Sequence, residues 1–156
     1  MEIFSTATLF LRFLALFLGE QQDDGEVMLI TGKYSVEIFD PSNPSLTCSL
    51  PDMTVSRIEH AAAGITVCGG DDYFGNVGQS CETLDGRQWT VTHKLQQKRE
   101  HHEMWQSPSK GIMLLGGQTR GTGNTVETLQ DDGSSVMQQW KLKYDTRYGD
   151  IKYKYC

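Results

Sequence analysis

The stretch "ITVCGGDDYFGNVGQSCETL", residues 65–84, decides the fold of this chain because its pattern recurs elsewhere in the sequence. Residues 112–129 read "IMLLGGQTRGTGNTVETL", with the same order of apolar run, glycine pair, polar loop and alternating run. A shorter counterpart, "MLITGKYSVEIF", occupies residues 28–39. Self-similarity at a spacing of roughly 20–50 residues is the signature of a repeat architecture. The sequence therefore predicts several copies of one structural unit.

Landmark residues recur in the same order, the glutamates and glycines in three copies and the arginines and histidines in two. Glu37, Glu82 and Glu127 are 45 residues apart, whereas Gly32, Gly70 and Gly117 are 38 and 47 residues apart, and the pairs Arg57/Arg99 and His60/His102 are each 42 residues apart. The unequal glycine spacing is expected where loops differ in length. We therefore divide residues 27–148 into repeats at 27–56, 57–98 and 99–146.

The repeated unit is predicted to be β. The runs "VMLIT", "ITVC" and "IMLL" are short, apolar and followed by glycine, as in buried strands. The runs "SVEIF", "SCETL" and "TVETL" alternate with the two-residue period of a half-buried strand. In "HKLQQKREHHEMW", residues 93–105, we predict that the second half is a strand, with His101 and His102 on opposite faces.

These residues resemble the kelch repeat, the four-stranded blade of a β-propeller. The resemblance rests on the glycine pairs Gly69-Gly70 and Gly116-Gly117, the run Val36-Glu37-Ile38-Phe39-Asp40-Pro41, Trp89, and the "LPxM…RxxH" wording at Leu50, Pro51, Met53, Arg57 and His60. The segments "TCSLPDM", "CGG", "SCE" and "LKYDT" look like those of cysteine-bearing, secreted kelch proteins of animals. Lys33 replaces the second glycine of the first pair, Asp150 stands where a histidine would follow Arg147, and the tail at 149–156 diverges.

The resemblance implies an all-β fold, an incomplete kelch-type β-propeller of about two to three four-stranded antiparallel blades. A closed propeller protects its sheet edges and buries each blade face against a neighbour. An incomplete one leaves two apolar faces and unpaired strands that invite association. We therefore expect either a truncated chain or a unit that self-associates through its open blade faces.

The N-terminal segment has a different composition. "TATLFLRFLALFLG", residues 6–19, is apolar, and a polar linker follows at 20–26. We interpret residues 1–19 as a cleaved signal peptide of a secreted protein. Glu2 and Arg12 depart from that pattern, so a signal anchor or a buried first strand stays an alternative. No later stretch is apolar enough to span a bilayer.

Four cysteines fit export. Cys68 ends one predicted strand and Cys81 lies at the start of the next, so we expect a disulfide between these two. Cys48–Cys68 is the alternative pairing. In a cytosolic protein the cysteines would instead be free thiols.

No catalytic, cofactor-binding or metal-binding set emerges from the sequence. Thr122 stands where a phosphate loop needs its second glycine, and Val126 where a dinucleotide loop needs its third, so the glycines are predicted to serve backbone turns. The repeated glutamates are expected to pair with Arg57 and Arg99. Structural or surface roles are expected for the histidines, and packing between blades for the aromatic side chains of Trp89, Trp105, Trp140 and Tyr34.

The expected function is a non-catalytic protein-interaction scaffold that binds an unknown protein. Net charge is −6 and basic residues are scattered, which disfavours nucleic acid as a partner. Variable loops are the expected binding surfaces, with candidate residues Asp71, Asp72, Tyr73, Phe74, Gln118, Thr119 and Arg120. One alternative is a kelch-type copper radical oxidase, which needs clustered Tyr, Cys and His ligands. Another is an intracellular kelch ubiquitin-ligase adaptor, which needs an additional N-terminal domain.

Overall fold

The protein is all-β, and no helix occurs in the part of the chain that the structure describes. This structure is a computed structural model that describes residues 10–12, 26–31, 34–40, 42–45, 47–72, 74–119 and 122–143. It accordingly contains no helix of the length and apolar character needed to cross a membrane within these ranges.

The strands form three antiparallel sheets, each with its strands in chain order. The first sheet consists of β1 (Phe10–Arg12), β2 (Glu26–Thr31), β3 (Val36–Phe39) and β4 (Thr47–Leu50). The second consists of β5 (Ala61–Ala63), β6 (Thr66–Cys68), β7 (Ser80–Leu84) and β8 (Trp89–Lys94). The third consists of β9 (Glu103–Ser107), β10 (Gly111–Leu115), β11 (Val126–Leu129) and β12 (Ser135–Met137).

Strand β1 comes from the segment expected to be a signal peptide. Phe10 pairs with Met28 and Arg12 with Glu26, so the first sheet begins ahead of residue 27. This arrangement corresponds to the alternative of a first strand at the N-terminus. Cleavage after residue 19 stays a prediction, because the pairing describes the intact chain.

The three sheets share one register. Glu37 lies opposite Ile30, Glu82 opposite Val67, and Glu127 opposite Leu114. The repeated glutamates therefore occupy equivalent places on the third strand of each sheet.

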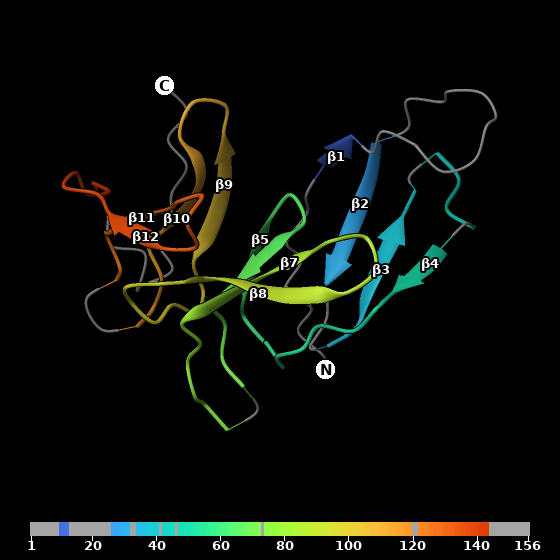
Figure 1. The fold of residues 1–156 in the computed structure, drawn as a ribbon, viewed down its shortest axis with the longest axis horizontal. Coiled ribbons are helices and arrows are strands. Elements are labelled where there is room, and N and C mark those ends of the chain that lie inside the picture. The colour runs from blue at the N-terminus through green and yellow to red at the C-terminus, as the bar shows by residue number, and fades with distance from the viewer. Residues whose placement is uncertain are drawn as a thin grey trace.

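The sheets lie side by side, with the second between the first and the third (Figure 1). Two apolar clusters fill the boundaries between them. The first contains Val36, Met53, Ala62, Val67, Leu84 and Trp89, and the second contains Cys68, Cys81, Leu95, Leu114 and Leu129. The core therefore lies between neighbouring sheets rather than inside any one of them.

The expectation that four aromatic residues pack between sheets is correct for one of them. Trp89 is 3% exposed, and its indole N–H donates to the Pro51 carbonyl at 2.9 Å across the first boundary. Trp105, Trp140 and Tyr34 are exposed, so the prediction is wrong for these three. Trp105 lies on β9 of the third sheet, which has no further sheet beyond it in the described chain.

The glycine pairs serve the backbone, as the failed nucleotide motifs indicated. Gly69, Gly70, Gly116 and Gly117 all have positive φ, a region that disfavours other residues. A Cβ on Gly70 would lie 2.5 Å from the Ile58 carbonyl oxygen. This close approach allows the bridge between Ile58 and Asp71 that ties the second sheet to the segment before it. Gly32 lies outside the described residues.

His101 and His102 do not belong to a strand, contrary to the prediction. Both precede β9, and His101 has a φ of 48°. The left-handed turn there exposes His101 and buries His102. Glu59, 42 residues earlier, has a similar φ of 57°, so the turn itself is repeated.

Candidate functional site

A buried Arg–Glu pair joins the first and second sheets. Glu82 on β7 accepts hydrogen bonds from the backbone N–H groups of Thr54 and Val55 at 2.8 and 3.2 Å, and from the Thr54 hydroxyl. Arg57 Nε lies 3.1 Å from the same carboxylate. Its other nitrogens donate to the Gly69 carbonyl and to Ser80. We call this arrangement, a buried glutamate held by the segment from the preceding sheet, a clamp.

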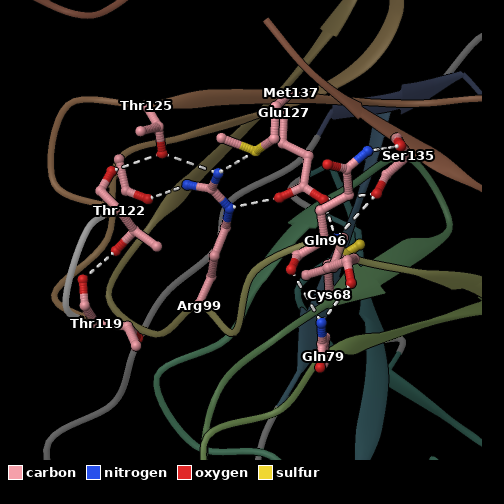
Figure 2. Close-up of polar contacts among 12 residues, drawn as sticks. Cys68, Gln79, Gln96, Arg99, Thr119, Thr122, Thr125, Glu127, Ser135 and Met137 are labelled. Atoms are coloured by element: carbon pink, nitrogen blue, oxygen red, sulfur yellow. Dashed lines mark hydrogen bonds and ion pairs between the residues drawn. The ribbon is translucent and has the colours of Figure 1, made fainter.

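A second clamp joins the second and third sheets (Figure 2). Glu127 on β11 accepts from Arg99 Nε at 2.9 Å, from the Gln96 backbone N–H and from the Ser135 hydroxyl. Arg99 also donates to the Gly116 carbonyl and to the Thr125 hydroxyl. Figure 2 shows the guanidinium extending between the Thr125 and Glu127 side chains.

Both clamps are structural in character. Arg57, Arg99, Glu82 and Glu127 are at most 1% exposed. Burial lowers the pKa of both guanidinium groups, and the paired glutamates oppose that shift. Buried charges require such partners because the desolvation cost of an unpaired charge is large. These carboxylates and guanidinium groups are therefore committed to holding sheets together.

Sequence reasoning foresaw the arginines and missed the other donors. Thr54 and Gln96 each stand three residues before the clamp arginine, and each contributes a backbone N–H. That shared offset is the signal that could have revealed them.

Glu37 has no clamp. Its side chain is exposed, and its carboxylate makes no hydrogen bond or ion pair within the described ranges. The expectation that all three glutamates pair with a repeated arginine is therefore wrong for Glu37. The physical reason is that Arg57 and Arg99 both lie after the first sheet and reach only forward, to the sheet that follows them.

Two buried histidines accompany the clamps. His60 Nδ1 lies 3.2 Å from the Arg57 carbonyl, and burial lowers its pKa to about 4. Burial, with the nearby Arg99 charge, lowers the pKa of His102 to about 3. Neither ring nitrogen of His102 has a hydrogen-bond partner among the described residues. The repeated histidines are thus neutral core residues at neutral pH.

Cys68 and Cys81 form a disulfide, as the sequence predicted. The two residues pair directly across β6 and β7, with their Cα atoms 4.0 Å apart. This bond excludes the alternative Cys48–Cys68 pairing, and Cys48 is a free, exposed thiol. A buried disulfide is compatible with an extracellular protein.

The loop between β6 and β7 presents an aromatic side chain to solvent. Phe74 is 85% exposed. The Asp72 carboxylate accepts from the backbone N–H groups of Phe74 and Asn76 at 2.8 and 2.9 Å and from the Asn76 amide at 2.8 Å. Such local bonding fixes a turn that would otherwise be free to change conformation. In Figure 1 this loop, drawn in green, projects away from the sheets. Tyr73 lies outside the described residues.

The corresponding loop of the third sheet, in the part that the structure describes, is bonded to a neighbouring segment and to itself. The Gln118 N–H donates to the Glu100 carbonyl at 3.0 Å, and the Thr119 carbonyl accepts from the N–H and the hydroxyl of Thr122. Arg120 lies outside the described residues. The two predicted binding loops therefore differ, and the one carrying Phe74 offers the large apolar side chain.

A carboxylate cluster that the sequence did not reveal lies beside the repeated turns. Oxygen atoms of Glu59, Asp71 and Glu100 lie within 4.8 Å of one another. Burial, with the charges of Asp71 and Glu59, raises the pKa of Glu100, and His101 opposes the rise. His101 also forms an ion pair with Glu59. The cluster is assembled from segments far apart in sequence, so spacing alone did not indicate it.

A scan against protein-family models finds no match for this sequence, and a search of curated proteins finds none either. The residues and their geometry are therefore the grounds for assigning a function.

Proposed function

We propose that this chain is an incomplete kelch-type β-propeller and acts as a secreted, non-catalytic protein-interaction scaffold. Three four-stranded antiparallel sheets, glycine pairs at equivalent places and two repeated clamps support the propeller reading. The saturated, buried state of the clamp residues supports a structural role for the charged groups that recur in the sequence.

The proposed binding function rests on the exposure of the Phe74 side chain to solvent. Aromatic side chains dominate the energetics of protein interfaces, and fixing a loop before binding reduces the entropy lost in the complex. Asp72 supplies that rigidity through three hydrogen bonds to the loop. The partner is accordingly a protein with an apolar pocket that receives the Phe74 ring.

The experiment compares wild type with Phe74→Ser and with a control, Val91→Ser. Val91 is 59% exposed on β8, so the control removes an exposed apolar side chain elsewhere. Proteins retained from an extracellular fraction are quantified for all three, and the affinity of each retained protein is then measured directly. We expect Phe74→Ser to weaken binding by about 30-fold or more, the effect of losing a hot-spot aromatic. Equal affinity of wild type and Phe74→Ser would contradict the assignment of this loop.

Secretion has a separate test. We expect protein recovered from the medium of expressing cells to begin near residue 20 and to carry the Cys68–Cys81 disulfide. Retention in the cytosol with an intact N-terminus and a reduced Cys68 would contradict secretion and leave the loop assignment standing.

A further inference from the structure

The clamps run in one direction along the chain. Each glutamate receives its donors from the segment that leaves the preceding sheet, residues 54–57 for Glu82 and residues 96–99 for Glu127. Glu37 occupies the equivalent register, and its carboxylate is exposed with no donor among the described residues. The first sheet thus presents an exposed carboxylate at the place where the other two sheets bind an arginine-bearing segment.

The third sheet presents the complementary part. In each repeat, the segment leaving the fourth strand returns a backbone hydrogen bond to the same place on its own sheet. The bonds run from Met53 to Tyr34 at 3.0 Å, from Leu95 to Gln79 at 2.8 Å and from Leu142 to Asn124 at 2.7 Å. The segment after β12 therefore begins with the same backbone hydrogen bond as the two segments that carry Arg57 and Arg99.

The apolar side chains that begin these three segments differ in burial. Met53 is 3% exposed and Leu95 is 1% exposed, each covered by the sheet that follows. Leu142 stays partly exposed. On β9, the edge strand of the third sheet opposite β12, Met104 packs against the second sheet, so the next side chain, Trp105, points away from that sheet and is 54% exposed. The end of the third sheet therefore has an apolar surface without a cover in the described chain.

The sequence then continues with an arginine. Arg57 follows Met53 by four residues and Arg99 follows Leu95 by four, whereas Arg147 follows Leu142 by five. Arg147 lies outside the described residues, so its place in the sequence is the observation used.

We infer that two copies of this chain assemble head to tail, each copy's Glu37 receiving the segment that follows β12 of the other. Arg147 and a backbone N–H would supply the donors, and Trp105 and Leu142 would be buried at the contact. A head-to-tail contact joins two different surfaces of the chain. All of these surfaces are covered only when the assembly closes into a ring. Two copies with three sheets each make a six-sheet ring, within the roughly 4–8 blades of closed propellers.

The test is the mass of the full 156-residue chain in solution, by sedimentation velocity. We expect a species of twice the mass of the single chain, which is 17.5 kDa for all 156 residues. Glu37→Lys should raise the dimer dissociation constant by about tenfold or more, because it places a cation opposite a cation. Asp131→Lys, the same charge change in the exposed turn after β11, should leave it unchanged. Near-ultraviolet circular dichroism of each variant verifies that it is folded.

A charge swap identifies the donor. Arg147→Glu alone should weaken the dimer as Glu37→Arg does, and a chain carrying both changes should recover it. A folded wild-type monomer at about 100 µM, well above the dissociation constant of a specific interface, would overturn the inference. A dimer dissociation constant that Glu37→Lys leaves unchanged would also overturn it, since the two copies would then associate through another surface.

Discussion

Replacing Glu82 by glutamine tests the clamp as the main link between the first two sheets. The carboxylate accepts two backbone N–H bonds, one hydroxyl bond and the charged bond from Arg57. Glutamine keeps the volume, removes the charge and turns an N–H₂ group toward these donors. Arg57 is 1% exposed, so its charge would stay buried without a counter-ion.

Removing one partner of a buried ion pair costs about 3–5 kcal/mol. Adding separate values for each lost hydrogen bond would give more, but bonds in one network are not additive. A domain of ordinary stability has about 5–15 kcal/mol in total, so the loss is a large fraction of it. With a urea m-value of about 2 kcal/mol/M, the midpoint of unfolding should fall by about 1.5–2.5 M.

The assay is urea unfolding followed by tryptophan fluorescence, since Trp89 lies at this boundary. Glu37→Gln is the matched control, because it makes the same change on an exposed residue in the same register. At concentrations where the chain is monomeric, the control should change the free energy of unfolding by less than about 0.5 kcal/mol. A cost for Glu82→Gln below about 1 kcal/mol, or equal to that of Glu37→Gln, would refute the reasoning.

Two further predictions concern the core between the sheets. The buried histidines have pKa values of about 4 and about 3, below the ordinary 6.5, so the unfolded chain binds protons first as pH falls. Stability should therefore decline as pH falls from 6.5, by about 1.4 kcal/mol per pH unit for each histidine, down to about pH 4 for His60 and about pH 3 for His102. The variant His102→Asn should remove one such contribution from the urea-derived profile. Replacing Cys68 and Cys81 by serine opens a loop with a separation of 13 residues. On chain-entropy grounds this should cost about 3 kcal/mol, and an unchanged melting temperature in reductant would contradict that value.

The sequence alone predicted the repeated unit and its local chemistry. Alternation in "SCETL" and "TVETL" placed Glu82 and Glu127 on strands, and the strand boundaries put Cys68 opposite Cys81. These properties depend on residues close in the chain, where strand period and turn chemistry are fixed by covalent geometry. The role of the glycine pairs in backbone turns could be predicted for the same reason, because a positive φ is a local requirement.

Only the tertiary structure decided which repeated residues are buried. Glu37 and Glu82 are equivalent in sequence, yet one is exposed and the other is 0% exposed. Trp105 was expected to be covered and is not, and the carboxylates of Glu59, Asp71 and Glu100 converge without any telling spacing. Burial and ion pairing depend on which sheet stands next to which. A repeat specifies its own strands and register, but its neighbour supplies the partner, so position within the row of sheets determines whether the same residue becomes core or an open surface.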